Sequence, residues 1–413
     1  MSRLRPSLPI ILCLLLFTDP VQAQQNEDSP LQSIDFTVHA MQSAQLLRTE
    51  SGGRNQQTSD EAEFGFHRIR FNLGVTAILH DRISVLADLG HEPNDFGADF
   101  APQVDYVALD LQLTDAITFR TGTPVTGLFN FRGYSDGAVT QSNPLIGNSP
   151  IDFVTAETGV TLIGSYDTFG WDLTWTSPDF FETFAPGTGF TLVGKLRGQL
   201  TETLSLGIGV GIGTNDATIS RRQTNGQAPR SALQEINLIV GDGENYSLPG
   251  FGPDGAGQPN RYTHAYLLPG AAPILFQVDA RVDLLPAFVD VWGGWGTERF
   301  SFADASGTPM NARLGTALVE QRSHLIWLGS TAKIFLSPQV YLAARGTYAD
   351  NQSGWAAGRS GTGLWRVQAG GGLSFFDRAL LKVEVVHQRE GAQSPGQIGE
   401  DWTGALVELS VDF

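Results

Sequence analysis

The sequence predicts an all-β chain whose strands close into a transmembrane antiparallel β-barrel. Three observations support this fold class: the composition, segments in which apolar and polar residues alternate at period two, and connections that are short and long in turn. Glycine occupies 48 of 413 positions, about 12 %, against roughly 7 % in average proteins. Outside the first 25 residues, no apolar run reaches the about 20 residues that a membrane-spanning helix needs. The composition therefore excludes a bundle of membrane helices, and an aromatic content of 10 % argues against a disordered chain.

The N-terminus has the pattern of a secretory signal peptide. Arg3 and Arg5 precede an apolar run at 8–17, and small residues end the segment at Ala23. This pattern predicts cleavage near Ala23. The single cysteine, Cys13, lies within the apolar run, so the mature protein is expected to contain no disulfide. The expected organisation is a signal peptide at 1–23, a short periplasmic N-terminal segment at 24–33 and a barrel at 34–413.

The barrel strands are predicted from segments of alternating polarity, each about ten residues long, which come in pairs joined by two or three residues. The seven hairpins are Phe66–Leu79 with Ile83–Gly90, Tyr106–Leu113 with Ala116–Thr123, Val154–Tyr166 with Phe169–Thr176, Phe190–Leu200 with Leu204–Gly213, Leu275–Leu284 with Phe288–Thr297, Ile326–Leu336 with Val340–Tyr348, and Leu364–Phe375 with Ala379–His387. Ile34–Leu46 opens the barrel and Trp402–Phe413 closes it, which gives about 16 strands.

Long polar connections separate these hairpins. Short turns at one end and long loops at the other are typical of a transmembrane barrel with short periplasmic turns, long outer loops and both termini in the periplasm. The fifth outer loop, 214–273, leaves the strand count open, because Leu233–Val240 and Tyr262–Leu268 could add two strands. The intervening periplasmic turn would then be about twenty residues long, whereas such turns are short. Sixteen strands are therefore preferred over the alternative of 18.

The last strand carries a sharp signal. Ala405, Val407, Leu409, Val411 and Phe413 are apolar at period two, and the chain ends on the aromatic residue. This resembles the C-terminal strand of bacterial outer-membrane barrels. The resemblance implies that Leu409, Val411 and Phe413 form an assembly signal read by the outer-membrane insertion machinery.

The face opposite the apolar one carries many charges. Its bases are Arg68, Arg70, Arg120, Lys195, Arg197, Arg281, Lys333, Arg345, Arg366 and Lys382. Its acids are Asp35, Asp88, Asp110, Glu157, Asp172, Asp279, Asp283, Asp290, Glu384, Glu408 and Asp412. A lysine or arginine facing lipid near the bilayer midplane costs about 2–4 kcal/mol, so this face is expected to line a wet lumen. The charges could pair with one another, or unpaired bases could line a constriction. The candidate pore wall consists of Arg68, Arg70, Arg120, Lys195, Arg197, Arg345 and Arg366.

Strand number, topology and the C-terminal motif resemble those of sixteen-stranded outer-membrane porins of the general or phosphate-selective kind. This resemblance implies that the third outer loop, 124–152, folds inward and narrows the lumen, facing a basic wall of Arg68, Arg70 and Arg120. The candidate constriction residues are Phe129, Phe131, Arg132, Tyr134, Asp136 and Asn143. Folding inward would bury Leu128 and Phe129; packing on neighbouring loops or on another subunit is the alternative.

The resulting function hypothesis is passive diffusion of small hydrophilic solutes or ions across the bacterial outer membrane. The alternative is a structural or binding barrel with a loop-sealed lumen and an outer surface that contacts a partner. The expected surroundings are the lipid bilayer and lipopolysaccharide. The resemblance to porins implies a homotrimer as one possible assembly. The sequence leaves four questions open: the solute, the preference for anions or cations, the choice between monomer and trimer, and the role of loop 214–273.

No enzymatic activity, cofactor or bound metal is expected. The seven histidines show no metal-ligand spacing, and the G-x-S-x-G match at 133–137 lacks the strand-to-helix turn of a catalytic serine. A formal net charge of −17 also disfavours nucleic-acid binding.

Overall fold

The computed structural model describes the strands and part of the third outer loop. The described residues are 31–49, 63–91, 103–123, 126–131, 142–147, 149, 154–155, 158–177, 189–215, 272–300, 321–352, 362–376, 378–390 and 401–413. The signal peptide expected at 1–23, most of 24–33 and most of the fifth outer loop lie outside these residues. Among the described residues, no helix has the length and apolarity required to span a membrane.

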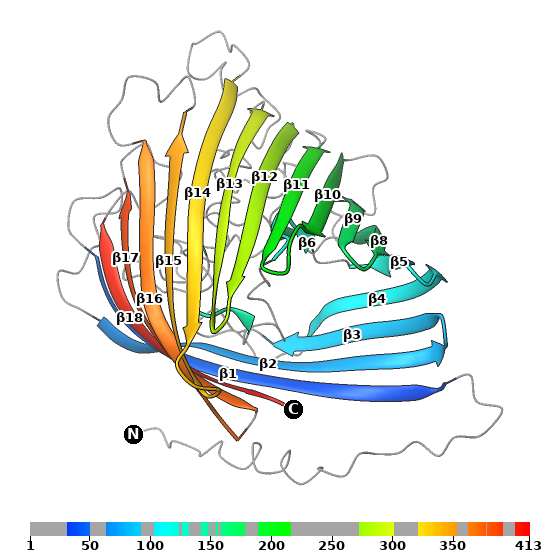
Figure 1. Ribbon diagram of the computed structural model, residues 1–413, viewed down its shortest axis with the longest axis horizontal. Coiled ribbons are helices and arrows are strands. Elements are labelled where there is room, and N and C mark those ends of the chain that lie inside the picture. The colour runs from blue at the N-terminus through cyan, green and yellow to red at the C-terminus, as the bar shows by residue number, and fades with distance from the viewer. Residues whose placement is uncertain are drawn as a thin grey trace, which may run out of the picture.

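Sixteen antiparallel strands close into one barrel, with neighbours in chain order around its circumference (Figure 1). The first half consists of β1 (Ser33–Thr49), β2 (Glu63–His80), β3 (Ile83–His91), β4 (Gln103–Thr114), β5 (Ile117–Gly122), β8 (Thr158–Ser165), β9 (Phe169–Ser177) and β10 (Gly189–Gln199). The second half consists of β11 (Leu204–Asn215), β12 (Ala272–Leu284), β13 (Ala287–Phe300), β14 (Gln321–Phe335), β15 (Val340–Asn351), β16 (Gly363–Phe375), β17 (Ala379–Glu390) and β18 (Trp402–Asp412). A separate two-stranded sheet joins β6 (Thr126–Gly127) to β7 (Val154–Thr155) within the third outer loop.

The strand count and the closure predicted from the sequence are confirmed. The last strand, β18, pairs with β1, and its C-terminal residue completes the ladder: Val38 N donates to Phe413 O at 2.9 Å, and Phe413 N donates to Val38 O at 2.8 Å. The alternative of 18 strands is excluded, because β11 pairs directly with β12 and leaves no place for strands between them.

The two ends of the barrel differ as expected. The connection between β12 and β13 is Leu285-Pro286, whereas that between β11 and β12 spans 216–271. The end with the short connections is called the short-turn end below. β1 starts at this end and β18 finishes at it.

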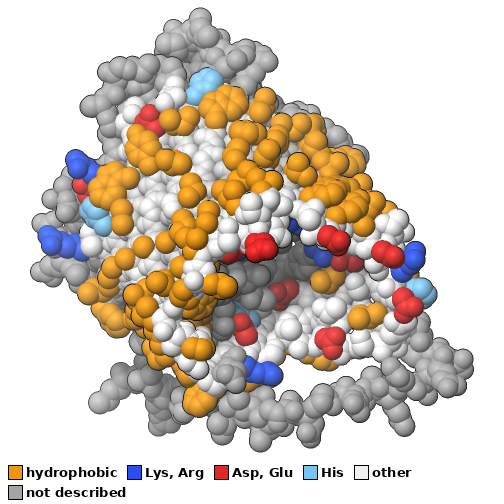
Figure 2. All heavy atoms as spheres, viewed as in Figure 1, with side chains coloured by type: hydrophobic (Ala, Val, Ile, Leu, Met, Phe, Trp, Pro, Cys, Tyr) orange, Lys and Arg blue, Asp and Glu red, His pale blue; other side chains and the backbone are white. Residues whose placement is uncertain are grey.

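Alternation sets the two faces of the wall. On β11, Leu206, Ile208, Val210 and Ile212 are 37–42 % exposed and point outward, whereas the intervening glycines point inward. Figure 2 shows the resulting bands of apolar side chains over the outer surface, and a hollow with acidic side chains around it. Aromatic side chains near the outer-loop ends of their strands, such as Trp175 at 59 % exposure, also face outward, which is the arrangement of an interfacial girdle.

We expect replacement of Phe413 by alanine to impair barrel assembly. Its ring is 50 % exposed at the end of the apolar face, and its main chain closes the barrel against β1. The Phe413→Ala variant should therefore give less heat-modifiable, membrane-inserted protein, measured by gel mobility with and without boiling. Alanine keeps the main-chain bonds, so unchanged insertion would show that the aromatic ring has no assembly role.

Candidate functional site in the barrel lumen

Charged side chains on part of the inner wall pair across neighbouring strands. Asp110 of β4 accepts two hydrogen bonds from Arg120 of β5, both at 2.7 Å. Asp172 Oδ2 on β9 lies 2.8 Å from Arg197 Nη1 and 3.2 Å from Lys195 Nζ, and both of these cations are on β10. The strand register places Arg120 opposite Asp110 and Lys195 opposite Asp172. The guanidinium-bearing side chains of Arg120 and Arg197 are 27 % and 33 % exposed, so this stretch of wall keeps charge in contact with solvent.

The first described segment of the third loop, 126–131, lies against β11–β13, the strands that follow β10 around the barrel. Asn130 donates from its main-chain N and from Nδ2 to the two carboxylate oxygens of Asp279 on β12, at 2.8 and 2.9 Å. The ring of Phe129 meets Trp292 of β13 edge to face, with centroids 5.3 Å apart. Leu128 is 1 % exposed and joins the same apolar cluster. One carboxylate and one apolar cluster thus hold this segment to the wall.

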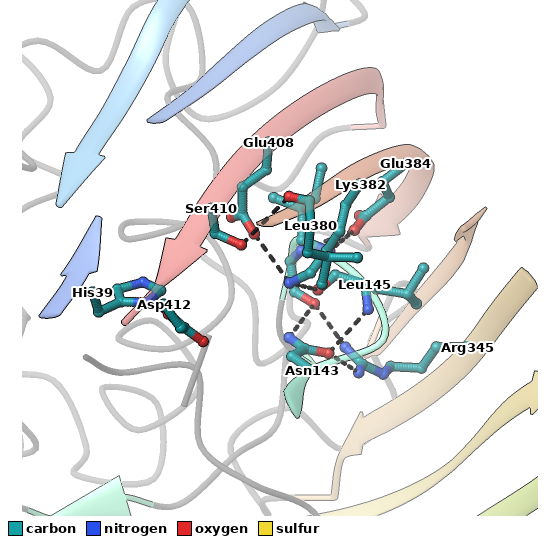
Figure 3. Close-up of polar contacts among 12 residues, drawn as sticks. His39, Asn143, Leu145, Arg345, Leu380, Lys382, Glu384, Glu408, Ser410 and Asp412 are labelled. Atoms are coloured by element: carbon teal, nitrogen blue, oxygen red, sulfur yellow. Dashed lines mark hydrogen bonds and ion pairs between the residues drawn. The ribbon is translucent and has the colours of Figure 1, made fainter. Parts of the chain in front are cut away.

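A second segment, 142–147, is held further around the barrel by side chains of β15–β17 (Figure 3). The main-chain N–H groups of Ile146 and Gly147 donate to one carboxylate oxygen of Glu384, at 2.6 and 2.8 Å. Arg345 donates to Gly147 O at 2.7 Å and to Asn143 Oδ1 at 2.8 Å. Hydrogen bonds to charged groups are the stronger class, so these contacts fix the loop main chain as well as its side chains.

Apolar and ionic contacts seal this second attachment. Leu145 packs with Tyr341, Ala343 and Leu380, all nearly buried. Beside them, the Nζ of Lys382 lies 3.0 Å from Glu408 Oε1 and 3.5 Å from Leu145 O. Lys382 and Glu408 are both 0 % exposed, so the loop and the wall together cover these charges completely.

The two carboxylates that hold the loop share a feature of strand register. Asp279 lies opposite Gly207 on one side and Trp292 on the other. Glu384 lies opposite Gly370 and Leu406. Neither acid therefore has a base directly across the ladder, in contrast to Asp110 and Asp172. A buried carboxylate needs hydrogen-bond donors, and the loop amides supply them.

Glycines next to these acids make room for the loop. A Cβ at position 207 would lie 2.5–2.6 Å from side-chain atoms of Asn130. One at 370 would collide first with the main-chain oxygen of Val383 on β17 and would also lie 3.1 Å from Leu145 Cδ2. A Cβ at 209 would collide with Leu128 O and would be 3.0 Å from Leu128 Cα. The alternating glycines of β11 thus form a shallow track that receives the main chain of the third loop.

The predicted pore-wall residues take different positions. Arg70 is 1 % exposed on β2, and Arg68 lies on the same strand with its side chain outside the described part. Arg345 is 2 % exposed beneath the loop, and Arg366 is 1 % exposed and donates to Gln388 at 2.6 Å. Arg70, Arg345 and Arg366 are therefore covered wall residues, unlike Arg120 and the cations of β10.

The structure describes only some of the predicted constriction residues. Phe129 and Asn143 are buried against the wall, and Phe131 is partly exposed. Arg132, Tyr134 and Asp136 lie outside the described residues, as does the G-x-S-x-G match at 133–137. In the portion of the chain that the structure describes, no group of three or more His, Cys, Asp or Glu residues could hold a metal ion.

Of the residues that hold the loop, Arg345 and Asn143 are candidates drawn from the sequence, whereas Asp279, Lys382, Glu384 and Gln368 are not. Asp279, Lys382 and Glu384 were expected on the inner face, but only as charges of unknown partner. Gln368, which donates to Gly147 O at 3.1 Å, carries no charge and gave no signal. An inward acid flanked across the ladder by glycine and an apolar residue is the pattern that would have identified Asp279 and Glu384.

Comparison with solved structures shows the fold that this geometry indicates. The chain is similar to a loop L8 deletion mutant of OmpT, an outer membrane protein of Vibrio cholerae, with a TM-score of 0.55, 10 % identity, and coverage of 92 % of this chain and 99 % of that one. It is similar to an anion-selective porin from Comamonas acidovorans, with a TM-score of 0.52, 11 % identity and coverage of 92 % and 99 %. It is also similar to OprB of Pseudomonas putida, with a TM-score of 0.52, 10 % identity and coverage of 92 % and 94 %.

No family profile matches the sequence, and no curated protein matches it. The chain therefore has the barrel fold of sixteen-stranded outer-membrane porins at a sequence identity near 10 %.

Proposed function

We propose that the protein is an outer-membrane porin through which small hydrophilic solutes or ions diffuse passively. The lumen is water-filled and is narrowed by the third loop, 124–152. The observation that carries this proposal is the contrast between the two parts of the inner wall. The charges of β15–β18 are buried, and the third loop contacts Arg345, Lys382 and Glu384 among them, whereas the charge pairs of β4, β5, β9 and β10 are partly exposed.

This contrast supports a path along the uncovered wall. Described residues of the loop are attached to β11–β13 and to β15–β17, and β2–β5 lie across the barrel from those strands. Partly exposed guanidinium and carboxylate groups require water, since lipid or an apolar core would not solvate them. The proposal assigns the chain no catalytic step, and it places the protein in the outer membrane after cleavage near Ala23.

Planar-bilayer recording of the purified mature protein tests the proposal. Stepwise conductance increases that scale with salt concentration are expected for open water-filled channels. Protein that inserts and shows heat modifiability but adds no conductance would refute the porin function.

The alternative is a structural or binding barrel whose lumen is sealed by its loops. The observation that favours it is the complete burial of Lys382 and Glu408 on the inner wall, where Lys382 lies against Leu145 of the third loop. Inserted but non-conducting protein would support this alternative.

The basic wall predicted from the sequence gives a prediction on ion selectivity, in which Arg120 is the partly exposed member and Arg70 is buried. Replacing Arg68, Arg70 and Arg120 with alanine should shift the reversal potential in a salt gradient toward cations. For Arg120 the reason is direct: its removal leaves Asp110 without its bidentate partner, so the local charge becomes negative. Charges further than a Debye length of about 8 Å are largely screened, so this local change should outweigh the net charge of the chain. The single Arg120→Ala variant should move the potential in the same direction, and an unchanged potential in both variants would contradict a role for this wall.

A further inference from the structure

Cations and aromatic rings gather on the inner face near the short-turn end of β12–β15. They are Arg281, Phe288, Lys333, Phe335 and Tyr341, called here the cation–aromatic patch. Each is in phase with buried inward residues of its strand, such as Asp290 for Phe288 and Thr331 for Lys333. The register places Phe288 opposite Lys333 and Phe335 opposite Tyr341, so the side chains share one area of wall.

The two cations of the patch differ in their partners. Arg281 lies 4.6 Å from the centroid of the Phe288 ring and is held by Asp290 through two hydrogen bonds at 2.7 and 2.8 Å. The Nζ of Lys333 lies 4.0 Å from the Tyr341 centroid and 4.6 Å from that of Phe335. Among the residues that the structure describes, Lys333 has no carboxylate and no hydrogen-bond acceptor as a partner.

This distinguishes Lys333 from five inward cations that are paired with a carboxylate. Arg120, Lys195, Arg197, Arg281 and Lys382 each lie within 3.2 Å of a carboxylate oxygen. Two aromatic faces orient the ammonium of Lys333 without neutralising it, since a cation–π contact leaves its N–H donors available. Lys333 is also partly exposed, so an anion in the lumen can reach it.

A neighbouring feature points to an organic anion rather than to an inorganic one alone. Phe335 is 41 % exposed on the inward phase of β14, which offers an apolar face beside the ammonium. The patch thus combines a positive charge that has no carboxylate partner among the described residues with an exposed apolar surface two residues away on the same strand.

We propose that the cation–aromatic patch is a binding subsite for small organic monoanions with a ring or other apolar body. The carboxylate binds the ammonium of Lys333, and the body of the solute lies on the ring of Phe335. This inference rests on the proposed porin function, because it requires solutes to pass through the lumen.

Channel block by benzoate tests the subsite. The mature protein is recorded in planar bilayers in potassium chloride while sodium benzoate or sodium acetate is added. Benzoate should reduce the chloride current at lower concentration than acetate does. In Lys333→Gln the half-blocking concentration of benzoate should rise about ten-fold, since a charge-assisted contact is lost. Lys333→Arg should retain the block, and Phe335→Ala should weaken block by benzoate more than block by acetate.

A control separates a local site from a general change in charge. Arg389→Gln removes the same unit charge from the outer-loop end of β17, where the side chain is 65 % exposed, and should leave benzoate block unchanged. If channels conduct but benzoate and acetate block equally, or if the Lys333 and Arg389 variants weaken block alike, the subsite is wrong and the porin function stands. If the wild-type protein forms no channels, the porin function fails and the subsite fails with it.

Discussion

Replacing Glu384 with alanine should release the third loop from β17 and raise both the conductance and the current noise of single channels. The carboxylate accepts hydrogen bonds from the main-chain N–H groups of Ile146 and Gly147, at 2.6 and 2.8 Å. Hydrogen bonds to charged groups contribute about 1.5–3 kcal/mol each, so the segment at 142–147 loses a large part of its attachment. The remaining contacts of Arg345 then hold a loop whose amides no longer have a protein acceptor.

Two further variants define the scale of this effect. Glu384→Gln keeps one acceptor oxygen but no charge, so its conductance and noise should lie between those of the wild type and Glu384→Ala. Deleting part of 128–148 removes the attached segments themselves and should give the largest conductance. A deletion channel with wild-type conductance would show that the loop does not narrow the path. Wild-type traces from Glu384→Ala alone would show that this carboxylate does not hold the loop.

The sequence predicted the barrel well because alternation is a local property. A strand with one lipid-facing side must repeat apolar residues at period two, and the connection lengths then assign the strands to hairpins. The segment predicted at Phe190–Leu200 forms β10 at Gly189–Gln199, and the closing strand predicted at Trp402–Phe413 forms β18 at Trp402–Asp412. The ends of these two strands differ by at most one residue from the prediction. Others differ more: Ile326–Leu336 belongs to the longer β14, Gln321–Phe335, and Val154–Tyr166 forms the shorter β8, Thr158–Ser165.

The attachment of the third loop could not be predicted in the same way. Asp279 and Glu384 lie 149 and 237–238 residues from their loop partners, so no short sequence window contains both sides of the contact. Only the strand register shows that each acid has glycine and an apolar residue across the ladder, and the register follows from closure of the barrel. The positions of two tryptophans also could not be predicted. A tryptophan on a barrel strand suggests the interfacial girdle, whereas Trp292 and Trp402 are buried, at 1 % and 0 % exposure.

Gly209 and Gly211 of β11 allow a prediction with a matched control on the same strand. Gly209→Ala should destabilise the protein by about 1–3 kcal/mol, the usual cost of overpacking, because its Cβ would collide with Leu128 O and lie 3.0 Å from Leu128 Cα. Main chain cannot give way as a flexible side chain does, so the segment at 126–131 must move away from β11. Gly211→Ala is the matched control on the same strand and face, since its Cβ would meet Leu128 Cδ2 and Leu275 Cβ at ordinary distances of 3.5 and 3.6 Å.

The measurement is the urea midpoint of unfolding for the detergent-solubilised barrels, read by gel mobility, together with single-channel noise. Gly209→Ala should lower the midpoint and raise the noise, whereas Gly211→Ala should match the wild type. Combining Gly209→Ala with Asp279→Ala should cost less than the two single losses together, because both act on the attachment of one loop segment. Additive losses, or equal behaviour of the two alanine variants, would mean that the glycine track serves strand curvature and does not receive the third loop.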